Sequence, residues 1–380
     1  MTSGPASGLA GGRLTIDMSA LGDNYRLMQT RSGPAKAAAV VKADAYGIGV
    51  DLAVRTLSAA GCDTYFVAQA DEGITVRKLA PNARIFVIYG APKGSEEALI
   101  EHRLVPLLCS PEQIERWGKL IRAKGTPLPY GIHVDTGMNR TGLTMDEARL
   151  IGIHADVLKA SGLCHVMTHP ACADDPDHPM NREQRASFQQ VREIFSGVEA
   201  AYANSAAILT TGASGGDITR PGIALFGGEA VNGNANPMHP VVTAETRIIQ
   251  IRHAKAGETV SYGATETLSH DSKIAVCATG YADGVHRASG NGVALRKSGL
   301  AKAAGFLCGH RVPVLGRVTM DFTMFDVTEV PDSVLDTAEW IELFGKNIAL
   351  DDAARAAGTI GYELLTSLGR RYCKEIVPNA

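Results

Sequence analysis

A lysine follows directly on a short apolar run near the beginning of the chain. Residues 37–41 are small and apolar, Lys42 comes next, and the following turn contains Asp44, Tyr46 and two glycines. Such a run is typical of a fully buried strand in a parallel sheet. Because a partly desolvated amine is a competent nucleophile, a lysine at the end of that strand could form a Schiff base with a carbonyl cofactor. A solvated lysine at a strand tip is the commoner case on composition alone.

Later apolar runs also adjoin polar side chains that could take part in chemistry. These side chains are Arg140, His169, the neighbours Asn204 and Ser205, and Arg220. Each has an ordinary interpretation by itself, since exposed arginine ion pairs stabilise a protein little and a single histidine is most often structural. At one end of one barrel, however, they would form a site, because the carboxyl ends of barrel strands line active sites.

The last of these runs offer groups that bind phosphate. Ser205 has a hydroxyl, and the backbone N–H groups of Gly222 and Ile223 belong to the region of the late strands, where barrels commonly bind phosphate. A lysine for an aldehyde, a phosphate site and a planar cation for a ring nitrogen together match pyridoxal phosphate (PLP). The sequence therefore predicts a PLP site and no metal site.

Eight apolar runs alternate with stretches of helical period over the first 230 residues. The runs lie at 37–41, 64–68, 84–89, 104–108, 129–135, 163–168, 200–204 and 221–226. This alternation predicts an α/β fold, an N-terminal (β/α)8 barrel of the TIM type. A doubly wound open sheet is the alternative, but no GxGxxG motif follows an early strand.

The sequence pattern changes near residue 240. A polar stretch at 232–240 that contains proline and glycine precedes the change, and we interpret it as a linker. Strand-like runs then dominate, at 241–253, 273–278, 292–295, 312–315 and 322–327, and only 350–357 and 361–368 look helical. We therefore expect a flexible tail at 1–12, a barrel at 13–240 and a mostly β C-terminal domain at 241–380. A strand at 13–17 joins either the barrel or the second domain.

Composition narrows the possible partners and compartments. The formal net charge of the 380 residues is −3, which argues against nucleic acid and anionic membrane surfaces. No apolar run approaches the ~18 residues of a membrane span, and the first residues lack the pattern of a signal peptide. Seven cysteines without a CxxC pair suit reduced thiols, so we expect a cytoplasmic protein.

Motifs along nearly the whole chain, from about residue 13 to about residue 373, resemble those of alanine racemases. The segment VKADAYGIG at 41–49 closely resembles their PLP attachment signature. The similarity continues through VDTGM at 134–138, TH at 168–169, NS at 204–205, RPGIALFG at 220–227, VSYGAT at 260–265, GYADG at 280–284, GRVTMD at 316–321 and GTIGYE at 358–363. The resemblance implies racemisation of alanine through a PLP external aldimine, supplying D-alanine for peptidoglycan.

The resemblance also implies roles for individual residues. Lys42 would hold PLP and act as the base for D-alanine, and Tyr262 of the partner in a homodimer would act on L-alanine from the opposite face. His169 would lie against the pyridine ring and Arg220 would face its nitrogen. The phosphate would be bound by Tyr46, Ser205 (beside Asn204), Gly222, Ile223 and Tyr362. The substrate carboxylate would meet Arg140 and the Met320 backbone, and Tyr281 would line the entrance.

One position departs from the family pattern. Many alanine racemases have a lysine two residues before the Asp-Thr-Gly run, and its carbamate orients the arginine that is Arg140 here. This chain has His133 at that position, and imidazole forms no comparable carbamate. We therefore expect an anion such as chloride, or a carboxylate such as that of Asp135, beside Arg140.

Several alternatives stay open at this point. A racemase of broader specificity, for example one that accepts serine, fits the same motifs. A PLP-dependent decarboxylase of barrel-plus-β architecture fits less well, because those enzymes place a glutamate on the pyridine nitrogen where this chain has Arg220. A non-catalytic PLP carrier would not need the second domain, and a protein without a ligand would not need the motifs.

Overall fold

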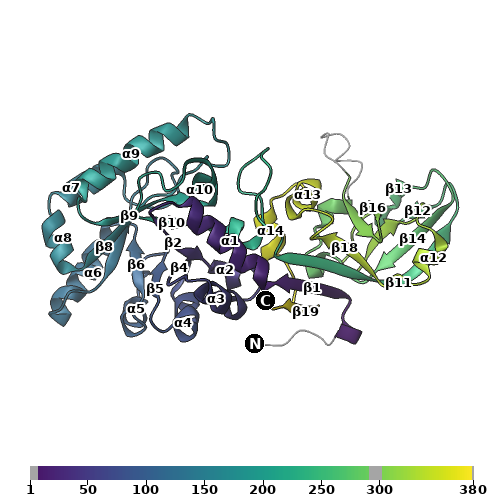
Figure 1. Ribbon diagram of the computed structural model, residues 1–380, viewed down its shortest axis with the longest axis horizontal. Helices are drawn as coiled ribbons and strands as arrows, with labels where there is room; N and C mark the ends of the chain where they lie inside the picture. Colours follow the sequence, from purple (N-terminus) through teal and green to yellow (C-terminus); the bar gives the residue numbers. More distant parts are fainter. Residues whose placement is uncertain (1–6, 291–301, 379–380) are drawn as a thin grey trace. The chain divides into compact units, whose positions relative to one another are not determined.

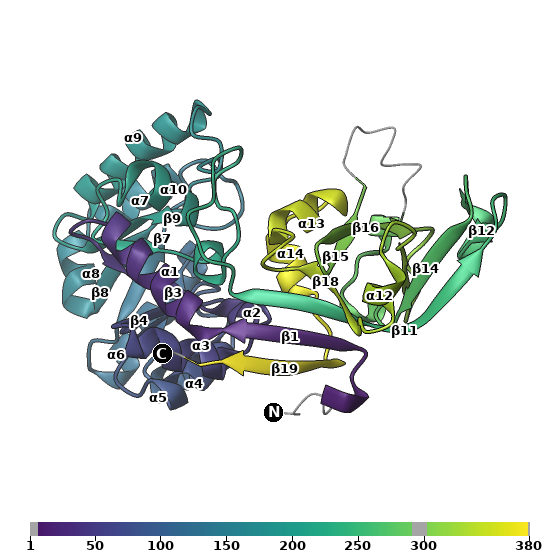
Figure 2. The same cartoon turned by 45° about the vertical axis from the view of Figure 1, so that its right-hand side comes forward.

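The computed structural model describes residues 7–290 and 302–378, which form two compact units (Figures 1 and 2). One unit contains Leu21–Leu225 and Glu229–Met238. The other contains the described residues up to Ala20, Phe226–Gly228 and everything described from His239 onward. No helix in the described ranges is long and apolar enough to span a membrane.

A closed parallel sheet forms the centre of the first unit. Its order is β2-β10-β9-β8-β7-β6-β5-β4-β3, and every neighbouring pair is parallel. The end strands β2 and β3 are consecutive segments separated only by Ala38, so the sheet closes on itself. The predicted barrel is confirmed, and the open sheet is excluded. The strands are β2 (Lys36–Ala37), β3 (Ala39–Val40), β4 (Thr64–Val67), β5 (Arg84–Val87), β6 (Val105–Leu108), β7 (Tyr130–His133), β8 (Leu163–Met167), β9 (Glu199–Asn204) and β10 (Ile218–Arg220).

Burial explains why these short runs form strands. Residues of β4, β6 and β7 are buried at every position, as expected for strands that are covered on both faces. Helices follow most strands and surround the barrel (Figure 1). They are α1 (Met18–Arg31), α3 (Val50–Ala59), α4 (Ala70–Leu79), α5 (Glu96–Glu101), α6 (Pro111–Lys124), α7 (Met145–Gly152), α8 (Ala155–Ser161), α9 (Met180–Ile194) and α10 (Ser205–Thr211).

The strand predicted at 221–226 is wrong. The last barrel strand, β10, ends at Arg220, and the apolar run after it forms the 3₁₀ turn η2 (Ile223–Phe226). Pro221 lacks the N–H group that would continue the ladder, and Gly222 favours a change of direction. The turn is buried, and its residues are therefore apolar. In the sequence, such an apolar run looks the same as a buried strand.

The second unit has an eight-stranded sheet of order β14-β17-β16-β15-β18-β11-β1-β19. Neighbours are antiparallel except β1 and β19, which pair in parallel. The mostly β prediction is confirmed, but β15, β18 and β19 were not predicted, and the strand predicted at 292–295 lies outside the described residues. The strands are β1 (Gly12–Asp17), β11 (Val242–Ala254), β14 (Ser272–Cys277), β15 (Ala304–Leu307), β16 (His310–Leu315), β17 (Thr323–Asp326), β18 (Trp340–Phe344) and β19 (Tyr372–Val377).

Short elements complete this unit. Of the predicted tail, Ser7–Leu9 forms a 3₁₀ turn, η1, and β1 begins at Gly12. A hairpin joins β12 (Thr259–Val260) to β13 (Glu266–Thr267), with the 3₁₀ turn η3 (Tyr262–Ala264) between them. The other elements are the 3₁₀ turns η4 (Tyr281–Asp283) and η5 (Arg287–Gly290) and the helices α12 (Asp332–Leu335), α13 (Leu350–Ala356) and α14 (Gly361–Thr366).

Candidate active site

Lys42 follows β3 at the carboxyl end of the barrel and opens a left-handed turn. The segment α2 (Lys42–Tyr46) is not an ordinary helix, because Ala43, Asp44, Ala45 and Tyr46 all have φ between 53° and 55°. This conformation costs roughly 1–2 kcal/mol for each L-residue. Four such residues in succession persist only where surrounding contacts hold them, and such strain is concentrated at functional sites.

The turn delivers the Tyr46 hydroxyl to the segment after β10. A Cβ atom at Gly222 would collide with the hydroxyl oxygen of Tyr46, so glycine is needed there. The Ser205 Oγ accepts hydrogen bonds from the backbone N–H groups of Gly222 (2.8 Å) and Ala224 (3.4 Å). The hydroxyls of Tyr46 and Ser205 therefore lie beside the segment after β10, and the predicted phosphate site stays a prediction. Asn204 has a structural task, since its Oδ1 caps α10 by accepting from the Ala207 N–H (3.0 Å).

The buried Arg220 contacts the half-buried His169 at the same end of the barrel. The Arg220 Nη1 lies 3.2 Å from His169 Nδ1, and Nη2 donates to the carbonyls of Thr168 (2.5 Å) and Tyr202 (3.1 Å). Because the guanidinium can only donate, the imidazole Nδ1 is the acceptor. Burial and the Arg220 charge lower the pKa of His169 well below its ordinary value, so the ring is neutral.

The third nitrogen of this guanidinium, Nε, differs from the other two. Arg220 Nε is buried and makes no hydrogen bond within residues 7–290 and 302–378. Burial and the charge of Arg140 lower the pKa of Arg220 to about 10, which leaves it a cation at neutral pH. A buried donor without an acceptor is costly. The geometry therefore favours a ligand atom that accepts a hydrogen bond there.

A polar network that was not predicted fixes the backbone of His169. Gln184 on α9 is fully buried, and its Nε2 donates to the His169 carbonyl (3.0 Å) and the Thr136 hydroxyl (3.2 Å). Its Oε1 accepts from the Ala171 N–H (2.8 Å), and the hydroxyls of Thr136 and Thr168 lie 2.6 Å apart. The network joins the ends of β7 and β8. A polar residue on the buried face of an amphipathic helix was the only sequence signal for it.

The charge balance at this rim is positive. Burial first, then Arg140 and Arg220, lower the pKa of Lys42, so a larger fraction of the amine is neutral than in water. Burial and the same two arginines lower the pKa of His133 to about 4. The His133 Nδ1 is buried and has no hydrogen-bond partner in the part of the chain that the structure describes. A rim with these charges favours an anionic ligand.

Asp135 does not serve as the counter-charge proposed for Arg140. Its Oδ1 instead accepts from the backbone N–H groups of Gly137 and Met138, each at 2.8 Å. Arg140 itself is exposed. Among the described residues no carboxylate forms an ion pair with its guanidinium, so the expected inorganic anion stays a prediction.

The remaining predicted residues belong to the other unit, and all four are exposed there. Tyr262 in η3 is 73% exposed, Tyr281 in η4 45%, Met320 55% and Tyr362 in α14 40%. Two of their segments are held together, because the N–H groups of Tyr281 and Ala282 donate to the carbonyls of Thr319 (3.0 Å) and Met320 (3.1 Å). The roles predicted for these four side chains stay predictions.

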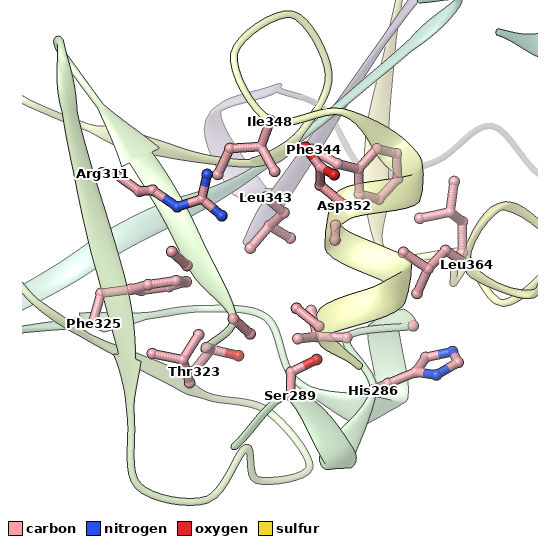
Figure 3. Close-up of a pocket in the computed structure, with 18 of the residues that line it drawn as sticks. His286, Ser289, Arg311, Thr323, Phe325, Leu343, Phe344, Ile348, Asp352 and Leu364 are labelled. Carbon is pink, nitrogen blue, oxygen red and sulfur yellow. The ribbon is translucent and has the colours of Figure 1, made fainter. Parts of the chain in front are cut away.

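A hollow in the same unit is not the predicted site. It lies among β16, β17, β18 and α13, and its lining is mainly apolar (Figure 3). Its polar side chains include His286, Arg311 and Asp352. None of the predicted site residues lines it.

A closed parallel barrel with a lysine amine and a buried arginine at the carboxyl ends of its strands, in a chain that also has a mostly antiparallel β unit, defines a two-domain barrel enzyme. The family model of the alanine racemase N-terminal domain matches residues 16–230, and that of the C-terminal domain matches 241–376. The chain therefore belongs to the alanine racemase family.

Individual relatives agree with this assignment. The chain is 51% identical to the alanine racemase of Rhizobium meliloti (strain 1021), with 98% of each chain covered. It is 50% identical to the biosynthetic alanine racemase of Agrobacterium fabrum, with 95% of this chain and 92% of the relative covered. The solved structure of the Bartonella henselae alanine racemase with covalently bound pyridoxal phosphate is 32% identical, with a TM-score of 0.88 over 97% of this chain and all of that one.

Proposed function

We propose that the chain interconverts L-alanine and D-alanine, with PLP bound to Lys42 at the barrel rim. The observation that carries this proposal is the position of Lys42. Lys42 lies at a strand end, and burial lowers the pKa of its amine. The same rim carries Ser205 and Arg220. When bound, PLP withdraws electrons from the α-carbon of an amino acid and so makes its proton removable.

The residues present fit PLP. The buried Arg220 Nε–H, which has no protein acceptor among the described residues, suits an unprotonated pyridine nitrogen. The Tyr46 and Ser205 hydroxyls and the backbone near Gly222 and Ile223 suit a phosphate. His169, held by Arg220 and Gln184, would support the ring.

Lys42 would bind the cofactor and then move a proton at the α-carbon. Both tasks require a neutral amine, and burial beside two arginines favours that form. The exposed Arg140 would bind the substrate carboxylate together with the Met320 backbone N–H. Because arginine does not readily release a proton, Arg220 would keep the ring nitrogen an acceptor and discourage transamination.

Racemisation needs a second base on the opposite face, and we assign it to Tyr262 of a partner subunit in a homodimer. Several large side chains of the second unit are exposed within one chain, as side chains that a partner subunit covers would be. Tyr262, Met320 and Ile360 are 73%, 55% and 60% exposed. Tyr362 would complete the phosphate site, and Tyr281 would line the entrance.

The compartment and the role of the product complete the proposal. All seven cysteines lie within the described residues and are free thiols, which suits the reducing cytoplasm. There the enzyme would supply D-alanine for peptidoglycan.

Circular dichroism of L-alanine during incubation with the purified protein and PLP tests this function. We expect the signal to decay to zero, and we expect a Lys42→Ala variant to leave it unchanged. Serine and larger amino acids, run in parallel, measure specificity. An unchanged L-alanine signal with the PLP-loaded wild-type protein would contradict the proposal.

A further inference from the structure

Glu72, on the third residue of α4, accepts hydrogen bonds from two different parts of the barrel rim. Its Oε2 accepts from the N–H groups of Ala68 (2.7 Å) and Gln69 (3.2 Å), which caps α4 after β4. Its Oε1 accepts from the Ala43 N–H at 2.7 Å. The second contact is not part of the helix cap. It reaches the residue that directly follows Lys42.

This contact holds the strained turn at the end where Lys42 lies. Ala43 is the first of the four residues with positive φ. Within the turn, Asp44 Oδ1 accepts from the N–H group of Val50, the first residue of α3 (2.8 Å). The turn spans from Lys42 to Tyr46 beside Gly222, so its conformation sets the separation of the amine from the phosphate site. If it relaxed, the two groups would no longer fit one ligand.

The Glu72 carboxylate also affects the pKa of Lys42. The charged and titratable groups around Lys42 are Arg140, Arg220, the neutral His169 and Glu72. Burial and the two arginines lower the pKa of Lys42, and Glu72 alone among these groups raises it. The Glu72 carboxylate therefore opposes the effect of the two arginines on the pKa of Lys42.

We propose that Glu72 is a positioning residue that fixes the left-handed turn and thereby the geometry of Lys42 relative to the phosphate site. The proposal rests on the proposed function, in which Lys42 binds PLP. It assigns to Glu72 a task beyond the stability of α4.

The chain contains a matched control for the capping task. Glu147 on α7 forms the same kind of capping box, since its Oε2 accepts from the N–H (2.8 Å) and the hydroxyl (3.0 Å) of Thr144. Both glutamates occupy the third helical position in the same barrel. Only Glu72 has a further contact to the turn at Lys42.

The experiment compares Glu72→Ala with Glu147→Ala in the full chain. The first readout is PLP affinity, measured by absorbance titration after the cofactor has been removed. Glu72→Ala should bind PLP about tenfold more weakly, the factor expected for one lost hydrogen bond to a charged acceptor, while Glu147→Ala should stay near the wild-type value. The second readout is the pH midpoint of Lys42 trinitrophenylation in cofactor-free protein, measured by peptide mass spectrometry. It should fall in Glu72→Ala and stay unchanged in Glu147→Ala.

Equal behaviour of the two variants in both readouts would overturn the proposal and leave Glu72 a helix cap. If Glu72→Ala does not fold, Glu72→Gln keeps the shape of the side chain and should still lower the midpoint. A wild-type protein that takes up no PLP at Lys42 would contradict the proposed function. The midpoint would still test the Glu72 contact in that case.

Discussion

Replacement of His133 by asparagine should change how the stability of the barrel depends on pH. Burial and two arginines lower the pKa of His133 from 6.5 to about 4, so the folded protein binds fewer protons than the unfolded chain between these values. Stability must therefore fall as the pH falls through that window. With these two pKa values the loss is about 2.5 kcal/mol at pH 4.5, and it is nearly absent at pH 7.5. Asparagine removes this contribution.

Urea unfolding of the cofactor-free chain at several pH values measures this effect. The chain has two tryptophans, Trp117 in the barrel unit and Trp340 in the other, so a Trp340→Phe background makes fluorescence report the barrel. The His133→Asn variant can differ at pH 7.5 through altered packing, and the test is therefore the change with pH. Between pH 7.5 and pH 4.5 we expect the free energy of unfolding of the variant to fall by about 2.5 kcal/mol less than that of its parent. His165 and His169 are present in both proteins, so their contributions cancel in this comparison. If the free energies of unfolding of the variant and its parent changed equally with pH, the argument from the burial of His133 would be refuted.

Three further predictions concern the chemistry. Arg220→Glu should let the ring nitrogen protonate and raise the number of transamination events per racemisation, measured from pyruvate formed against D-alanine formed; an unchanged ratio would argue against the fidelity role of Arg220. Mixed inactive Lys42→Ala and Tyr262→Phe subunits should regain activity, since one of the two sites in a heterodimer has both bases; no recovery despite proven subunit exchange would count against a base supplied in trans. Activity should be indifferent to bicarbonate, because His133 forms no stable carbamate, and a carbamylated lysine found against Arg140 would overturn this expectation.

The sequence was sufficient for the barrel because its strands are short, largely apolar and alternate with stretches of helical period. It also predicted that His169 follows a buried strand, as it does after β8. Arg220 ends β10, whereas the strand predicted at 221–226 would have begun after it. The prediction failed at 221–226, where burial of a 3₁₀ turn imitates a strand, and at β19, whose last four residues are exposed. Period-2 reasoning depends on one consistently buried face.

The conformation of the turn after Lys42 and its long-range contact could not be predicted from the residues next to it in the sequence. The left-handed turn contains Ala43, Asp44, Ala45 and Tyr46, none of them glycine, so intrinsic preference argues against the conformation observed. Its hydrogen bond to Glu72 crosses 29 residues of sequence. The contact between the Glu72 carboxylate and the Ala43 N–H depends on the closed barrel, which brings α4 beside the turn after β3.

The most direct test of the central claim is borohydride reduction of the purified PLP-loaded protein, followed by peptide mapping. The account predicts a yellow protein that loses its colour on reduction, with the cofactor fixed to the peptide that contains Lys42. Cofactor fixed to any other lysine, or to none, would contradict it.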